Sequence, residues 1–583
     1  MKNVIYLLLI TLVIWSCGNN NGKKENGRVA NGNVYYGGIF KMNESENFKN
    51  LYPFAVTEVG SQRIDNQIYE GLVKLSQTDL TILPSLAEKW DKNDDATVWT
   101  FYIRKGVKFH DDPCFPGGKG REVNANDFKY CFTRLCESRG DNQWFGISFK
   151  GRVAGADEYY ESTFKSKPLA EGVKGIKVID DYTLQIELVA PFSGFLNILT
   201  TPACWVFPKE AVDQYKDDMR VKCVGTGPFR VKSIIEGESV ILDRNPDYWA
   251  IDEHGNQLPY LDALKFSFVK EKKSEFLEFK RGNLDMIFRL PVEMIPEIVG
   301  DLEHAKDNNV NFEMQVVPAL SVFYLGFQNQ LPPFNKKAVR QAFNYSINRK
   351  KITNYTLQGE GIPAIYGFVP PSFKDYNNNS VKGYDFDPEK AKKLMAEAGY
   401  PNGKGFPKVI LQTNSGGGDR NINVAEVVQK MLKENINVDV DINVLSFSEL
   451  LENVEMGKTS FWRAGWLADY PDPETFLSVL YGGTVPNDPS QRSSPNSIRY
   501  KSPVFDSLFK SALREKDIKA RYELYRKADQ VAAEDAALMP IFYEEHYRLL
   551  QKNVRNFDAN GMEYRDFSKV YFVPDGAVND KKK

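Results

Sequence analysis

Few side chains in this sequence are placed for hydrolytic or metal chemistry. The chain has four histidines in 583 residues, and no two of them are spaced as in the zinc-binding patterns HExxH or HxxxH. The four are His110, His254, His304 and His546. A peptidase would need a nucleophile with a base, or a metal site. The sequence therefore predicts that the protein is not an enzyme and that it holds no metal and no cofactor.

One carboxylate lies where α/β proteins commonly bind their ligands. Residues 461–468 read as the last strand of a series, and Asp469 follows at the carboxyl end of that strand. In open α/β sheets, ligands bind beyond the carboxyl ends of the strands. Asp469 is therefore the first candidate for a binding side chain. The simpler alternative is that it caps a turn before Pro471.

The elements around this residue alternate between helix and strand. Asp387, Pro388 and Glu389 supply an N-cap, a first-turn proline and an early acid for a helix that should end at Gly399. The pattern then predicts a strand at 409–412, a helix at 421–433, a strand at 438–444 and a helix at 447–456. Such alternation predicts a mainly parallel, helix-covered sheet over residues 400–470.

The composition is that of a globular protein with several units. Of the residues, 42% are hydrophobic and 26% charged, and at roughly 100 to 200 residues per domain the length predicts two to four units. Residues 99–103 and 184–188 alternate apolar and polar side chains, as half-buried strands do. The 75 Lys and Arg residues nearly balance the 77 Asp and Glu residues, so no net field favours a nucleic-acid partner.

The first 16 residues read as an export signal. Lys2 supplies one positive charge, and residues 4–14 form an apolar run that is too short to span a bilayer as a mature helix. Cys17 follows in a pattern that resembles a bacterial lipobox. This predicts cleavage before Cys17 and a lipid on its thiol, which would be the chain's one membrane attachment. A short anchor that is never cut is the alternative.

A polar segment separates the signal from the folded chain. Residues 17–32 are mostly Gly, Asn, Lys and Glu, so we expect a flexible tether and a folded body that starts near Asn33. Five cysteines follow, and an odd number in an exported protein leaves at least one thiol unpaired. They are Cys114, Cys131, Cys136, Cys204 and Cys223, and we predict no disulfide among them.

Several motifs together resemble one protein family. Residues 83–90 read Leu-Pro-Ser-Leu-Ala-Glu-Lys-Trp, and residues 225–229 read Gly-Thr-Gly-Pro-Phe. Residues 245–249 read Asn-Pro-Asp-Tyr-Trp, and residues 500–506 read Tyr-Lys-Ser-Pro-Val-Phe-Asp. In this order they are similar to motifs of the bacterial periplasmic oligopeptide- and dipeptide-binding proteins, the solute receptors of ABC importers (solute-binding protein family 5). The likeness covers nearly the whole mature chain.

The resemblance implies an α/β fold of two lobes, the class II periplasmic-binding-protein flytrap with three domains. Lobe 1 would comprise residues 33–320, with an inserted subdomain at about 73–185. Lobe 2 would comprise residues 321–543, and residues 544–583 would return to lobe 1 and form the tail. The change of pattern near the middle of the chain is consistent with this division.

The resemblance also implies a ligand strand. Residues 463–470 read Arg-Ala-Gly-Trp-Leu-Ala-Asp-Tyr, similar to the strand that pairs with peptide in the oligopeptide-binding members. By this resemblance Asp469 would hold the peptide's α-ammonium group and Arg463 its carboxylate. Gly465 and Leu467 would supply backbone contacts by β-augmentation, and Trp466 would form part of the pocket wall. An interlobe ion pair for Arg463 and a core position for Trp466 are the simpler alternatives.

Other contacts follow from the same resemblance. Val59 would face the ligand backbone from the opposite lobe. The lysine that the family carries in the helix after the hinge is Asn344 here, which removes one carboxylate contact, and Arg420 is the candidate substitute. The six residue steps from Arg463 to Asp469 span about 20 Å of strand, which favours peptides of about three to five residues.

These observations predict a lipid-anchored, monomeric, extracytoplasmic binding protein in the periplasm or cell envelope. It would deliver short peptides to an ABC transporter permease, without a nucleic-acid partner. Fold alone does not select the cargo, so a non-peptide solute such as an oligosaccharide or a metal chelate is an alternative, as is an exported enzyme such as a peptidase. The motif ending in Asp469 favours peptide over sugar.

Overall fold

The computed structural model describes residues 28–574, except 57, 143, 193, 291–293, 304–309 and 416–418. The predicted signal peptide, Cys17 and most of the tether lie outside the described residues. Strand β1 (Arg28–Val29) pairs antiparallel with β2 (Tyr35–Tyr36), and Asn31 N donates to Asn256 Oδ1 at 3.1 Å. Local structure thus begins inside the segment expected to be tether, because its last residues find backbone and amide partners.

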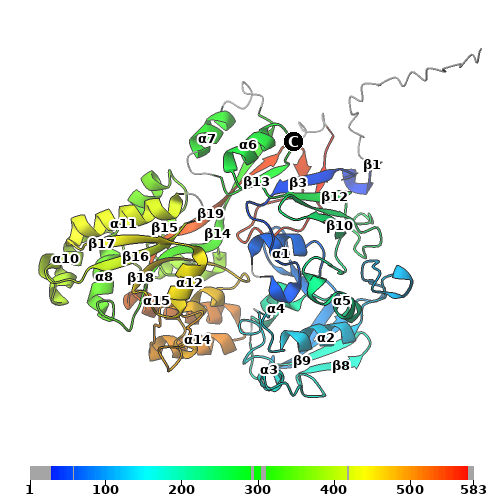
Figure 1. The fold of residues 1–583 in the computed structure, drawn as a ribbon, viewed down its shortest axis with the longest axis horizontal. Helices are drawn as coiled ribbons and strands as arrows, with labels where there is room; N and C mark the ends of the chain where they lie inside the picture. Colours follow the sequence, from blue (N-terminus) through cyan, green and yellow to red (C-terminus); the bar gives the residue numbers. More distant parts are fainter. Residues whose placement is uncertain are drawn as a thin grey trace, which may run out of the picture.

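The chain forms two lobes (Figure 1). The first lobe, drawn mainly in blue and cyan, holds two four-stranded sheets. One has the order β10 (Phe229–Ile235), β11 (Ser239–Arg244), β12 (Ala263–Ser267), β3 (Ile39–Asn43), and the other β6 (Ala87–Lys92), β7 (Val98–Ile103), β9 (Thr183–Glu187), β8 (Ile176–Asp180). The smaller elements of this lobe are β4 (Val73–Leu75), β5 (Ile82–Pro84), α1 (Val59–Asp65), α2 (Ala125–Leu135), α3 (Ala156–Phe164), α4 (Phe195–Ile198) and α5 (Lys209–Tyr215).

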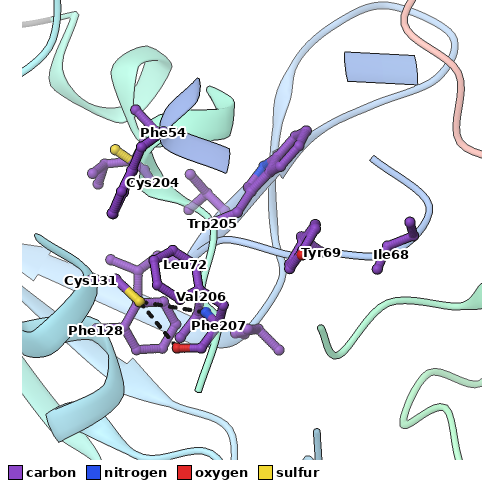
Figure 2. Packing of buried hydrophobic residues seen from close by; sticks show 14 of the residues in the cluster. Phe54, Ile68, Tyr69, Leu72, Phe128, Cys131, Cys204, Trp205, Val206 and Phe207 are labelled. Atoms are coloured by element: carbon purple, nitrogen blue, oxygen red, sulfur yellow. Dashed lines mark hydrogen bonds between the residues drawn. The ribbon is translucent and has the colours of Figure 1, made fainter. Parts of the chain in front are cut away.

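Helix α2 illustrates how the sequence builds the core of this lobe. Asn124 and Asp127 form a reciprocal capping box at its start, and its buried face includes Phe128. Figure 2 shows Cys131 of α2 directed at the backbone of Phe207, whose carbonyl accepts from Cys131 Sγ at 3.3 Å. Burial raises the pKa of this thiol above its ordinary value, so it serves packing rather than reactivity. All five cysteines of the described chain are free thiols.

The second lobe is built on a mixed seven-stranded sheet. Its order is β13 (Met286–Phe288), β19 (Leu538–Gln551), β14 (Phe312–Phe327), β18 (Phe461–Leu467), β16 (Val409–Asn414), β17 (Val440–Leu445), with β15 (Ile362–Pro363) also pairing with β19. The pairs β16–β17 and β16–β18 are parallel, as predicted for residues 400–470. The sheet as a whole is not mainly parallel, because the other pairs are antiparallel.

The helices of the second lobe follow the predicted pattern. Helix α10 (Pro388–Glu397) begins at the predicted cap, where the Asp387 carboxylate accepts from Lys390 N at 2.9 Å, and Gly399 takes a φ of +92° just after its end. The other helices are α8 (Lys337–Tyr345), α9 (Arg349–Lys351), α11 (Arg420–Ile436), α12 (Phe447–Glu455), α13 (Glu474–Leu477), α14 (Pro503–Arg514) and α15 (Ile518–Glu534).

Two long strands, β14 and β19, run from the second lobe into the upper part of the molecule (Figure 1). There they meet β13, α6 (Lys272–Lys280) and α7 (Ile295–Glu303), and the short pair β20 (Val554–Arg555) and β21 (Tyr571–Phe572) follows in the chain. The β14–β19 register shifts between Pro318 and Val322, opposite Tyr543 and Glu545. Separate hydrophobic clusters lie on either side of this shift.

Within the described residues, no helix combines the length and the apolar character that a membrane span requires.

Candidate functional site

Strand β18 has one edge that is only partly paired. Along its whole length, Phe461 to Leu467, it pairs with β14. On its other side it pairs with β16 at Phe461 and Trp462. From Arg463 to Leu467 no described strand pairs with it on that side. The sequence expected as the ligand strand therefore presents an open sheet edge.

The antiparallel register determines which residues face this open edge. Ala468 N donates to Leu320 O at 2.9 Å, so the even-numbered residues of β18 form the hydrogen-bonded pairs with β14. The main-chain groups of Arg463, Gly465 and Leu467 consequently point away from β14. Gly465 is exposed, so another backbone can approach closely. An added strand would find a donor and an acceptor at every second residue.

Asp469 lies just beyond the end of β18 and has no cationic partner. Its carboxylate accepts a hydrogen bond from Thr475 Oγ1 at 3.4 Å, and no Lys or Arg of the described chain lies within 4.0 Å of it. Solvent reaches the side chain, but the surrounding protein still desolvates it. This desolvation, with the nearby charge of Glu474, raises the pKa of Asp469 to about 6.

The acids next to Asp469 are each matched by an arginine. Asp472 pairs with Arg521 at 2.8 Å, and Glu474 lies 3.6 Å from Arg152 of lobe 1. Asp472 also accepts from Glu474 N at 3.0 Å, so among the described residues the turn is capped by Asp472 rather than by Asp469. Asp469 is left as the unmatched negative charge.

The same loop contacts the opposite lobe. Asn197 Nδ2 of lobe 1 donates to Asp472 Oδ2 at 3.4 Å, and the buried ring of Tyr470 packs in the hydrophobic core of lobe 1. Together with the ion pair between Arg152 and Glu474, these contacts hold the two lobes together immediately beside Asp469.

Arginines gather at the other end of the open edge. Arg463 lies over the ring of Phe323 with its Cζ 4.7 Å from the centroid, and Arg420 lies over Phe542 at 4.8 Å. The two rings stack on each other with their centroids 4.7 Å apart. Arg463 Nη1 donates to Asn414 Oδ1 at 3.2 Å. The interlobe ion pair considered for Arg463 is absent from the described residues, since no carboxylate lies within 4.0 Å of it.

Two glutamates share this basic end. Arg420 lies 3.2 Å from Glu544 and 3.6 Å from Glu360. Burial alone would raise the pKa of Glu544, but Arg420, Arg289 and Arg463 outweigh it and lower that pKa to about 2. Burial raises the pKa of Glu360 despite Arg420. Burial also lowers the pKa of the Arg463 guanidinium to about 10.

The remaining candidates take different places. Trp466 is half-buried against the core of lobe 2, and its Nε1 donates to Thr475 Oγ1 at 3.2 Å, so it packs in the core and also supports the Asp469 loop. Val59 is the half-buried first residue of α1 in lobe 1. Asn344 is fully buried in α8 and accepts from Arg349 Nη2 at 2.8 Å, so it points into lobe 2. The glycines before Arg420 lie outside the described residues.

Comparison with known proteins assigns the family. The model of the bacterial extracellular solute-binding proteins, family 5, matches residues 81–488. The chain belongs to this family. The predicted family and the predicted two-lobed α/β fold are therefore confirmed, and the protein is a solute-binding protein rather than an enzyme. In the described residues of this family 5 protein, no group of three or more His, Cys, Asp or Glu side chains is arranged to hold a metal ion.

Relatives of this family 5 protein bind different cargoes. It is 29% identical to the periplasmic oligopeptide-binding protein OppA of Escherichia coli (strain K12), over 87% of this chain and 88% of that one. It is 26% identical to heme-binding protein A of Haemophilus influenzae, over 98% and 99%. Among solved structures it is similar to the periplasmic binding protein DppA from Helicobacter pylori in complex with the peptide STSA, with a TM-score of 0.75, 27% identity and coverage of 92% and 99%.

Sequence reasoning missed part of the site of this family 5 protein. Glu544, Glu360 and Arg289 were not expected near Arg420. The signal that could have found one of them is the pair Glu544-Glu545, which directly follows the buried stretch 538–543 of the strand. Charged residues inside a buried strand commonly mark a functional position.

Proposed function

We propose that this protein captures short peptides outside the cytoplasm for an ABC importer. The observation that carries the proposal is the open edge of β18, with an unmatched carboxylate at one end and arginines at the other. A short peptide has the complementary charges: an ammonium group, a chain of backbone donors and acceptors, and a carboxylate.

The charges give the ligand a direction. With its ammonium group at Asp469 and its carboxylate near Arg463, the peptide runs antiparallel to β18. Its backbone then pairs with the outward main-chain groups of Gly465 and Leu467. Because these hydrogen bonds do not depend on the peptide's side chains, specificity is broad. The two charged ends of the edge are six residue steps apart, about 20 Å, which favours peptides of about three to five residues.

The loop around Asp469 also supports lobe closure in this proposal. Because Asp469 lies beside the contacts of Asp472 and Glu474 with lobe 1, an ammonium group bound there reduces the repulsion among three neighbouring acids. Closure then becomes more favourable with ligand than without it. The closed form is the one that we propose docks on the permease. Val59 of α1 would approach the ligand from lobe 1.

Two similar proteins support peptide as the cargo. One is named as a periplasmic oligopeptide-binding protein, and the structure of the other is a complex with a peptide. Native mass spectrometry of the purified protein with its co-purified ligands tests this choice. We expect masses of short peptides. A single non-peptide solute, such as a tetrapyrrole, would overturn it.

The proposed anchoring of the peptide's amino group can be tested on the wild-type protein. In isothermal titration calorimetry, a tripeptide with a free amino group should bind much more tightly than the same tripeptide acetylated at its N-terminus, because acetylation removes the charge that Asp469 would hold. Equal affinities would contradict the assignment of Asp469.

We also propose that the mature protein is a monomer anchored to the membrane through a lipid on Cys17, in the periplasm or cell envelope. The lipobox-like sequence before Cys17 supports this. Radiolabelled fatty acid should enter the wild-type chain and not Cys17→Ser, which should leave the membrane fraction. Membrane retention of the serine variant at the signal-bearing mass would favour the uncut anchor instead.

A further inference from the structure

The basic end of the open edge includes arginines that no carboxylate of the described chain pairs with. Three arginines lower the pKa of Glu544, which lies at this end: Arg289, Arg420 and Arg463. Of these three, Arg420 forms ion pairs within the described chain, with Glu544 and Glu360. Arg463 and Arg289 therefore lack an ion-pair partner among the described residues.

The guanidinium groups also have unused donors. Arg420 Nε and Nη2 and Arg463 Nε are buried and have no hydrogen-bond partner in the described structure. A guanidinium group carries five N–H donors, and leaving them buried without an acceptor is unfavourable. The stacked rings of Phe323 and Phe542 hold both groups in place, so an anion would meet them already oriented.

Arg289 reaches this end from the other side of β19. It follows β13, and its N–H donates to Tyr547 O of β19 at 3.2 Å, three residues from Glu544. Its side chain is exposed, and its charge contributes to lowering the pKa of Glu544. Its φ of +60° is rare for a residue other than glycine, and such backbone conformations gather at functional positions.

We propose that this end accepts two carboxylates, so that the protein prefers peptides with an acidic side chain at the carboxyl-terminal residue, and that Arg289 sets this preference. One carboxylate is the terminal one, which the proposed function places near Arg463. The second is the Asp or Glu side chain, which would pair with Arg289, an exposed arginine without an ion-pair partner among the described residues. The inference rests on the proposed function and adds a side-chain preference that backbone pairing alone does not provide.

The alternative is that Glu544 already satisfies the cluster. In that case Glu544, held by Ser321 and Arg420, would supply the anion itself, and a second ligand carboxylate would gain nothing. The unused donors favour the proposal, because Arg420 Nε and Nη2 and Arg463 Nε still lack an acceptor with Glu544 and Glu360 in place.

Calorimetry with two matched tetrapeptides tests the proposal on the full chain. Ala-Ala-Ala-Glu and Ala-Ala-Ala-Gln have the same shape and differ by one charge. We expect the acidic peptide to bind about tenfold more tightly, the effect of one charge-assisted hydrogen bond. A ratio below about threefold overturns the preference and leaves the proposed function standing. If neither peptide binds, the proposed function fails and the inference fails with it.

Variants assign the preference to Arg289. In Arg289→Gln the ratio of the two affinities should collapse toward one, because the glutamate side chain loses its cation. Arg289→Asn repeats the test with a residue that tolerates positive φ. Arg281→Gln is the matched control: Arg281 is an exposed arginine at the end of α6, paired with Glu278, and its loss should leave the ratio unchanged. An unchanged ratio in both Arg289 variants, or a collapse in the control, would refute the assignment.

Discussion

Two carboxylates at opposite ends of the open edge show what decides the protonation of a desolvated acid. Neighbouring protein desolvates both Asp469, which solvent still reaches, and Glu544, and in both this desolvation favours the protonated form. Yet the pKa of Asp469 is raised to about 6, whereas that of Glu544 is lowered to about 2. The difference lies in their neighbours, since Glu544 faces three arginines and Asp469 faces Glu474. Of the two carboxylates, the one without a cationic neighbour in the protein is the one that can form an ion pair with a cationic group of a ligand.

The sharpest test of this comparison is Asp469→Asn. The substitution keeps the size of the side chain and removes its charge, so a peptide with a free amino group should lose about 3 kcal/mol of binding free energy, roughly a hundredfold in affinity. Calorimetry measures this loss. The N-acetylated peptide is the control and should change little. A comparable loss for both peptides would show that Asp469 supports the fold of the loop instead of holding the ligand's charge.

Glu544→Gln tests the opposite end through stability. Because the folded pKa is depressed, the ion pairs stabilise the fold above the unfolded pKa near 4.5, and this contribution disappears as the pH falls toward 2. We expect the variant to lose about 2 kcal/mol of unfolding free energy at pH 7 in urea denaturation. At pH 3 the gap to wild type should shrink.

Glu545→Gln provides the matched control for that experiment. Glu545 is adjacent on β19 and accepts from Gly361 N at 3.0 Å, an interaction that a glutamine side chain can keep. Its substitution should change stability less than Glu544→Gln. A larger effect at position 545 would mean that the arginines contribute little to holding Glu544.

The open edge itself can be tested with proline. The Gly465 N–H points away from β14, so Gly465→Pro removes a donor for the ligand and none for the sheet. We expect peptide affinity to fall about tenfold, as for one lost hydrogen bond with some strain. Ala464→Pro removes a bond to β14 and should lower stability by about 3 kcal/mol in denaturant unfolding. Similar stability losses at both positions would contradict the assigned register.

The smallest expected effect is that of pH on binding. Bound ammonium should lower the pKa of Asp469 below its free value of about 6, so affinity is full above pH 6 and falls by up to about tenfold per unit below it. Glu474 and Asp472, whose pKa values burial raises, face the same loop along with Arg152 and Arg521.

The contribution of Asp469 is isolated by subtraction. The affinities of the free and the acetylated peptide are measured by calorimetry at pH 7.5 and pH 5.0. Subtracting the pH effect on the acetylated peptide from that on the free peptide removes the effects that the two ligands share. The free peptide should weaken more than the acetylated one, and Asp469→Asn should abolish the difference. If both ligands respond equally to pH, the titrating group is not Asp469.

The sequence predicts local elements of this protein better than it predicts which of them meet. Helix α10, the parallel pairs of β16 and the position of Asp469 after β18 follow from capping residues and apolar periodicity, and the structure has them. The roles of Asp469 and Arg463 stay predictions, since they came from resemblance. The mixed sheet was missed because long antiparallel pairing, as between β14 and β19, joins segments some 200 residues apart and leaves no local pattern.

The same reason explains the missed glutamates. Glu360 and Glu544 meet Arg420 because β15 pairs with β19 and helix α11 begins beside that pair. Arg289 joins them only through the pairing of β13 with β19. These contacts depend on tertiary strand order, which neither propensity nor spacing encodes.

In the proposed binding mode, the charges that flank the open edge also decide which molecules are excluded. An unpaired edge invites any extended chain to add to the sheet, which is a route to aggregation. A segment in the interior of a longer polypeptide brings neither terminus to Asp469 or Arg463, and its continuing chain must leave past both. In the proposed binding mode, whole, short peptides are therefore accepted, and the loops and tails of other proteins are excluded. Recognition of the chain ends would let one receptor accept peptides with many different side chains without binding the extended segments of other proteins.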